Sequence, residues 1–221
     1  MSTLLHNELK KEFQLERMVL FSDAVFAIAI TLLVIEIKVP ELHEATDRLL
    51  GIELLHMIPK FIGFFVSFFV IGIYWVAHHR IFGYLTAYST RLIWMNLFFL
   101  LSIVLMPFTT AFYSEYSAPW FRLPFAIYII NICFTGYMNY RLWMHITDKE
   151  AGLTDIVISP LQRSYGKWRT LTVPAVFLVG LILAFIAPFF SRFTPMLIPV
   201  FMALLSKRYA KLGLSKEHRK L

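Results

Sequence analysis

The chain has 221 residues, of which 58% are hydrophobic and only 16% are charged, and its formal net charge is +7. A water-soluble domain of this length could not cover so much apolar surface with so few charges, so the composition excludes a soluble globular protein and predicts an all-α integral membrane protein. We interpret the excess of positive charge as a signal of membrane topology, and we expect no nucleic-acid partner.

The first predicted membrane helix covers residues 17–38, which contain neither glycine nor proline, and we expect Pro40 to end it. On a helical wheel its apolar stripe consists of Phe21, Ala24, Ile28, Leu32 and Ile35, with Thr31 at its edge. Ser22 and Asp23 lie about 120–140° away from this stripe. Because a carboxylate is costly in a bilayer, Asp23 should point into protein and not toward lipid. The residues before this helix predict either a short helix along the cytoplasmic surface or a frayed tail.

Five further apolar segments predict membrane helices over residues 56–79, 90–114, 121–143, 169–191 and 194–208. Residues 41–60 and 141–169 are the main polar connections. The last apolar segment is the shortest, so a re-entrant or interfacial helix is an alternative to a sixth span. We expect residues 1–221 to form a single domain with six transmembrane helices.

The basic residues support this arrangement. Six spans place sixteen of the 21 lysines and arginines on the side of the two termini and five on the opposite side. Because positively charged loops are retained in the cytoplasm, both termini should be cytoplasmic in a multi-pass protein.

Polar residues of three predicted helices meet at one depth in this topology. Ser22 and Asp23 lie near the cytoplasmic end of the first helix, Trp75 and His78 at that end of the second, and Asn96 at that end of the third. We expect hydrogen bonds among them to fix the rotation of the first helix and to leave its apolar stripe facing away from its own subunit. The competing hypothesis makes Asp23 and His78 a proton relay.

No arrangement of residues predicts an enzyme. The side chains of His78 and His79 diverge on a helix, and neither an HExxH sequence nor a pair of cysteines accompanies them. The sequence has no glycine-rich phosphate loop and no nucleophile elbow. We therefore expect no catalytic residues, no metal and no cofactor.

The start of the first helix carries the pattern RxxxFSD, formed by Arg17, Phe21, Ser22 and Asp23 and followed by AVFAIAITLLV. A WxxHH element ends the second predicted helix. Together with the six-span arrangement, these features closely resemble the bacterial transmembrane-protein-175 family, the prokaryotic relatives of the lysosomal potassium channel. The resemblance covers essentially the whole chain.

The resemblance implies a potassium-preferring cation channel, with no cofactor beyond the permeant potassium ions. It implies a homotetramer in the plasma (inner) membrane of a bacterium, with a non-canonical potassium channel fold that lacks a TVGYG filter. The first helix of each subunit would line the pore. The hydrophobic constriction of the family maps onto Ile28, then Leu32 and Ile35, and its pore-facing threonine maps onto Thr31. Glu36 would concentrate cations at the outer mouth.

Arg17 lies close to the direction of Ile28 on the wheel, near the inner mouth, where an unpaired cation would hinder cation entry. We therefore expect Arg17 to be paired. Two other functions stay open. A proton-coupled secondary transporter or a proton leak pathway would use Asp23 and His78, although the first helix lacks the break that is typical of transporters. A membrane scaffold that carries no ions is the third hypothesis.

Overall fold

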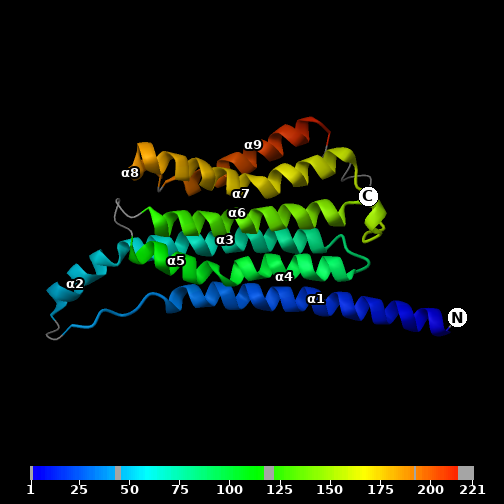
Figure 1. The fold of residues 1–221 in the computed structure, drawn as a ribbon, viewed down its shortest axis with the longest axis horizontal. Coiled ribbons are helices and arrows are strands. Elements are labelled where there is room, and N and C mark those ends of the chain that lie inside the picture. The colour runs from blue at the N-terminus through cyan, green and yellow to red at the C-terminus, as the bar shows by residue number, and fades with distance from the viewer. Residues whose placement is uncertain (1, 43–45, 117–121, 192, 214–221) are drawn as a thin grey trace.

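The computed structural model describes residues 2–42, 46–116, 122–191 and 193–213. Within these residues the chain is helical and has no strand, and its long helices run side by side along one axis (Figure 1). Residue 121, residue 192 and residues 214–221, which enter the predicted fourth helix and the charge count, lie outside the described residues.

The N-terminal helix α1 is continuous from Ser2 to Ile35. The prediction of a separate surface helix or a frayed tail before residue 17 is therefore wrong, and the helix also ends before residue 38 and well before Pro40. No glycine or proline interrupts residues 2–35, so nothing in the sequence stops the helix between its polar and its apolar parts. The polar start of α1 extends beyond the other helices (Figure 1).

The polar connection after α1 contains a short helix, α2 (Asp47–His56), which the side chain of Thr46 caps. The second long helix, α3 (Ile58–Phe82), follows it directly and replaces the predicted span over residues 56–79. The predicted span over residues 90–114 is divided at Leu105 into α4 (Thr90–Val104) and α5 (Met106–Glu115). The division follows from Pro107, which has no N–H to donate to the preceding turn.

The next two long helices form a closely packed pair. Helix α6 (Leu123–Ile146) replaces the span predicted over residues 121–143. Helix α7 (Pro160–Ile186) begins nine residues before the predicted position 169, so the polar connection is much shorter than predicted. The reason is a capping box: Ser159 accepts from the backbone N–H of Gln162, and Gln162 accepts from that of Ser159. The short helix η1 (Lys149–Ala151) lies between them.

The chain ends in short helices. After α7 come α8 (Pro188–Ser191), η2 (Thr194–Leu197) and α9 (Ile198–Lys211), so the last predicted helix begins with a 3-10 turn and continues beyond residue 208. The predicted continuation of the fifth helix to residue 191 is wrong, because α7 ends at Ile186.

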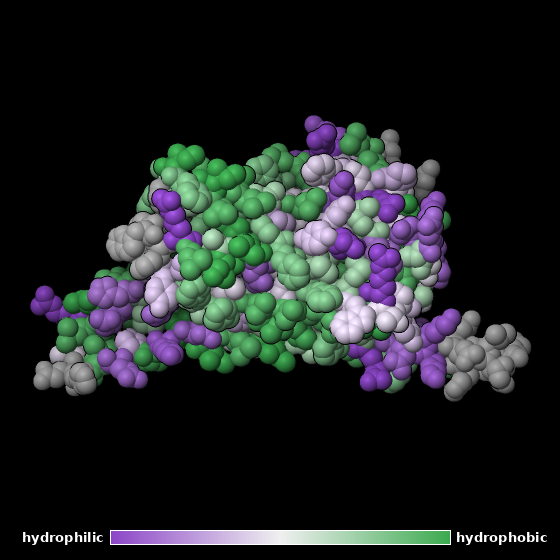
Figure 2. All heavy atoms as spheres, in the orientation of Figure 1, coloured by the Kyte–Doolittle hydropathy of each residue, from purple (hydrophilic) through white to green (hydrophobic). Residues whose placement is uncertain are grey.

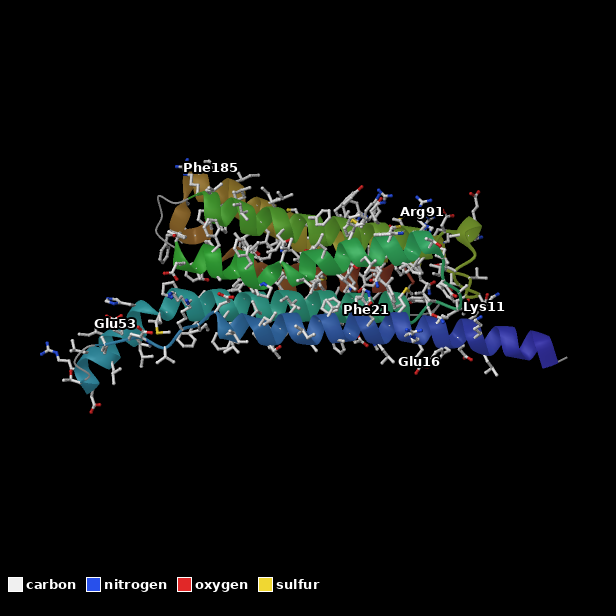
Figure 3. The ribbon with its side chains drawn as sticks, turned by 60° about the horizontal axis from the view of Figure 1, so that its bottom comes forward. Lys11, Glu16, Phe21, Glu53, Arg91 and Phe185 are labelled. Atoms are coloured by element: carbon white, nitrogen blue, oxygen red, sulfur yellow. The ribbon has the colours of Figure 1, made fainter. Side chains whose placement is uncertain are left out.

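Four helical segments of the described chain are long and apolar enough to cross a membrane, by length and composition: Leu9–Ile35, Ile58–Phe82, Thr90–Glu115 and Pro160–Ile186. The other two predicted spans correspond to α6 and to α9, which has 14 residues. Hydrophobic side chains gather over the middle of one face of the molecule and hydrophilic ones toward its ends (Figure 2). Lys11 and Arg91 lie toward one end, and Glu53 and Phe185 toward the other (Figure 3).

Candidate functional site

Helix α1 presents two different faces. Ser22, Phe26, Ala29 and Leu33 are each at most 2% exposed and recur at intervals of three or four residues, which is the spacing of one helix face. This face packs against α3, α4 and α5. It determines which way the rest of α1 points.

The predicted apolar stripe lies outside this packed face. Ile28 is 59% exposed, and Ile35 is 67% exposed. Phe21, Ala24, Thr31 and Leu32 are also exposed in the subunit. A stripe of large apolar side chains that its own subunit leaves uncovered must meet lipid, another subunit or a pore.

Ser22 begins a chain of directed hydrogen bonds that crosses the three helices. Its hydroxyl donates to the carbonyl oxygen of Met18 at 2.9 Å, so its oxygen must accept from the next group. The Nδ2 of Asn96 donates to it at 2.9 Å. The Oδ1 of Asn96 lies 2.9 Å from the Nε2 of His78, and this nitrogen must therefore carry the proton and donate.

Aromatic rings enclose the imidazole of His78, which is 1% exposed. Phe82 stacks on it with ring centres 3.8 Å apart, and Phe99 lies nearly parallel to it at 5.3 Å. Phe26 of α1 approaches the same ring at 5.6 Å. These contacts hold the imidazole in the orientation that the bond to Asn96 requires.

Asp23 is held separately from this chain. The indole Nε1 of Trp75 donates to its Oδ1 at 2.9 Å, and the ring of His79 stacks on the same indole at 5.6 Å. The structure thus brings together all five residues of the predicted anchoring group, but it pairs Asp23 with Trp75 and not with His78.

The hydroxyl of Thr31 lies at the edge of the exposed stripe. It donates to its own helix, with oxygen distances of 2.8 Å to Ile28 and 3.1 Å to Ala27. Because the single hydroxyl proton is used within the helix, the lone pairs of the oxygen are left for a partner outside it. Such an oxygen can accept a hydrogen bond from water or contact a cation.

Two charged residues with predicted roles, Arg17 and Glu36, have different surroundings. The guanidinium of Arg17 lies 5.8 Å from the ring centre of Phe13, and among the described residues it forms no ion pair, so the expected pairing is not found within one subunit. Glu36 lies just beyond the end of α1, beside a cavity of about 380 Å³. On that cavity Lys60 pairs with Glu115 at 2.6 Å, a contact that the sequence pattern did not predict.

A second set of polar contacts was not predicted either. The hydroxyl of Tyr128 lies 2.9 Å from that of Ser67, and the hydroxyl oxygens of Ser67 and Thr110 lie 2.8 Å apart. The three residues come from α6, α3 and α5, and all are at most 5% exposed. The presence of Ser67 and Thr110 inside otherwise apolar helices is the signal that could have indicated a bond between helices.

Comparison with known proteins places this arrangement among ion channels. The family described as "Endosomal/lysosomal potassium channel TMEM175" matches residues 17–107. A potassium channel of Chamaesiphon minutus is 31% identical over 207 residues, which is 90% of this chain and 98% of the relative. An endosomal/lysosomal proton channel, TMEM175 of Gallus gallus, is 33% identical over 109 residues, or 46% of this chain and 22% of that one.

The fold is also similar to a solved structure. The crystal structure of a lysosomal potassium-selective channel TMEM175 homolog from Chamaesiphon minutus matches with a TM-score of 0.72 and 30% identity. The match covers 86% of this chain and 97% of the other.

Proposed function

Because this chain belongs to the TMEM175 family, we propose that it is a potassium-preferring cation channel in the plasma membrane of a bacterium. The observation that carries the proposal is the exposed stripe of α1, in which Ile28 is 59% exposed while Phe26, two positions away, is 1% exposed. The hydrogen bonds of Ser22 and Asp23 to α4 and α3 support this rotation of α1.

One pore-lining helix per subunit requires several copies of the chain to enclose a pore. The resemblance to the family implies a homotetramer, so we assign four subunits. In this assembly the stripes of four α1 helices face one another around the axis. The surface of α1 that is exposed in a single subunit would then line the pore and would not contact lipid.

Ile28 forms the narrowest ring of this pore, with Leu32 and Ile35 beyond it. An isoleucine ring offers no oxygen to an ion, so an ion passes only if the opening retains much of its hydration shell, and the pore closes if the ring dewets. Dehydration costs less for potassium than for sodium, and the Thr31 oxygens lie just past the ring. We therefore expect modest selectivity, with Glu36 raising the local cation concentration at the outer mouth.

The same proposal assigns six membrane spans to one domain over residues 1–221. They are the apolar part of α1, then α3, α4 with α5, α6, α7 and α9. Helix α9 would reach only about 21 Å at 1.5 Å per residue, so Lys207 and Arg208 would have to extend toward the interface. The distribution of basic residues supports cytoplasmic termini. The chain acts on cations and needs neither catalytic residues nor a cofactor.

A proton pathway is the second candidate, because the animal relatives are described as proton channels. In this chain the hydrogen bonds from His78 end at the carbonyl oxygen of Met18, which has no proton to pass on. Asp23 is bonded to an indole that exchanges no proton at ordinary pH. A relay through these residues would therefore require the bonds to rearrange.

Flux through the purified protein in liposomes separates these functions. We expect a potassium gradient to drive faster cation flux than an equal sodium gradient. A folded protein that passes protons while potassium and sodium are replaced by a large impermeant cation would support the proton pathway. Equal flux of potassium and sodium, or no flux at all, would contradict the proposed channel.

A further inference from the structure

An apolar groove of about 870 Å³ runs along α3. Its first wall consists of α3 side chains, among them Phe65, Phe69, Ile73 and Trp75. Its second wall comes from η2 and α9, with Met196, Ile198 and Met202. Helices α7 and α9 pack on each other, whereas α3 and α9 barely touch, so the groove between them is open.

The groove has a charged end. Arg169 of α7 lines it and also lines a second cavity, of about 260 Å³, between α3, α6 and α7. Arg80 lies on this second cavity. Ile73 and Arg80 are seven residues apart on α3 and therefore share one face of the helix, which joins the apolar groove to the charged cavity.

Arg80 and Arg169 thus line the same cavity. No aspartate or glutamate lines the second cavity, and neither Arg80 nor Arg169 forms an ion pair within the part of the chain that the structure describes. Arg80 is exposed and Arg169 is half-buried, so both guanidinium groups can bind an anion from outside the chain. Arginine is well suited to phosphate, which it binds through two hydrogen bonds.

One wall of the charged cavity is formed by a tightly packed tryptophan, Trp143. A Cβ atom on Gly166 of α7 would overlap the ring of Trp143 of α6, so glycine permits the close contact of these two helices. The indole Nε1 of Trp143 donates to the carbonyl oxygen of Arg163 at 2.9 Å, and Tyr84 contacts the same indole edge-on at 5.9 Å. The cavity therefore has a packed aromatic wall.

We infer that the groove and the cavity together bind one anionic phospholipid of the cytoplasmic leaflet. Its phosphate lies between Arg80 and Arg169, and an acyl chain lies in the groove along α3. Phe65 and Arg80 are about 22 Å apart along the helix axis, while one leaflet supplies about half of the ~30 Å hydrocarbon core. An acyl chain therefore fills most of the groove and reaches Trp75, whose indole holds Asp23 of α1.

This inference requires that the chain span a membrane, but not that it conduct ions, so it is tested by binding alone. The full-length protein is placed in phosphatidylcholine bilayers that contain increasing fractions of phosphatidylglycerol with brominated acyl chains. Bromine quenches an indole that it touches, so Trp94 and Trp168, which lie on neither cavity, and Trp120 are first replaced by phenylalanine. The remaining indoles, Trp75 and Trp143, lie on the groove and the cavity. Brominated phosphatidylcholine serves as the neutral comparison.

We expect the wild-type protein to prefer phosphatidylglycerol, and the preference to fall roughly fivefold for each of Arg80→Ala and Arg169→Ala. The Lys variants at both positions should retain most of it. Arg141→Ala is the matched control, because it removes the same charge near the same end of the bundle but outside both cavities. An unchanged elution volume shows that each variant is folded.

Three results would overturn the inference. The first is an unchanged lipid preference in the Arg80→Ala/Arg169→Ala protein. The second is loss of the bound lipid in millimolar inorganic phosphate, which would indicate a site for a small anion. The third is the absence of quenching by either brominated lipid, which would indicate that a neighbouring subunit covers the groove.

Discussion

The indole Nε1 of Trp75 donates a hydrogen bond of 2.9 Å to the Oδ1 of Asp23, and this bond joins α3 to the helix that carries the exposed stripe. Together with the bonds of Ser22 it ties α1 to α3 and α4 in the rotation that turns the stripe outward. A pore lined by α1 requires that rotation, because only then does Ile28 point away from its own subunit.

Removal of the Trp75 donor should loosen α1. Trp75→Phe keeps a ring but loses the hydrogen bond to a charged group, which we expect to cost about 1–2 kcal/mol because the indole is partly exposed. The thermal midpoint of the detergent-solubilised protein should fall by several degrees. Trp168→Phe is the control, since no hydrogen bond of that indole is found in the described chain. Equal midpoints for the two variants would show that the bond contributes nothing.

Two buried serines allow a hydrogen bond between two helices to be compared with a hydrogen bond within one helix. Ser22 and Ser102 are both 0% exposed, but Ser22 accepts from Asn96 whereas the hydroxyl of Ser102 donates to Phe99 of its own helix. Ser22→Ala should destabilise the protein by about 1 kcal/mol, in the range of hydrogen bonds between membrane helices. Ser102→Ala should lower the thermal midpoint less. If Ser102→Ala is the more damaging change, the bond between Ser22 and Asn96 does not anchor α1.

Glycine substitutions test the packing of α6 on α7. A Cβ at Gly166 would overlap the Trp143 ring, so Gly166→Ala should cost about 1–3 kcal/mol through overpacking. Gly72 of α3 has no atom within 4 Å of such a Cβ, and Gly72→Ala should be neutral or stabilising by up to about 1 kcal/mol. Measured retention of folded protein after heating should rank the wild type above Gly166→Ala. The opposite ranking would contradict the helix contact.

The Thr31 oxygen should contribute to selectivity and not to conduction itself. Thr31→Val has nearly the same shape but no oxygen, so we expect a lower ratio of potassium to sodium permeability with flux retained. Thr31→Ser keeps the oxygen and should keep the ratio. The permeability ratio is measured from the reversal potential, with potassium on one side of the bilayer and sodium on the other. An unchanged ratio in Thr31→Val would place these oxygens outside the ion path.

Some of this arrangement could be predicted from the sequence. Polar residues a few positions inside three apolar helices must find partners at that depth, so the grouping of Ser22 and Asp23 with Asn96 follows from position. Which group bonds to which does not follow, because it depends on helix rotation. The pairing of Asp23 with Trp75, and not with His78, comes only from the structure.

Two other features differ in whether the local sequence indicates them. The start of α7 was marked by Ser159 and Gln162, a recognisable capping pair that the polar character of the segment obscured. The bond between Ser67 and Tyr128, by contrast, joins residues that are 61 positions apart. Arg17, which has no ion pair among the described residues, lies near the ring of Phe13, a contact that its position on the wheel did not predict.

The most direct test of the central claim compares two asparagine substitutions on α1. Ile28 is 59% exposed and Val34 is 53% exposed, but Val34 points about 120° away from Ile28 around the helix. We expect Ile28→Asn to change potassium flux in liposomes strongly and to reduce its preference over sodium, because it makes the proposed constriction polar. Val34→Asn should leave both quantities near the wild type. Potassium flux that is unchanged by Ile28→Asn, or that changes equally with both substitutions, would contradict a pore lined by the exposed stripe of α1.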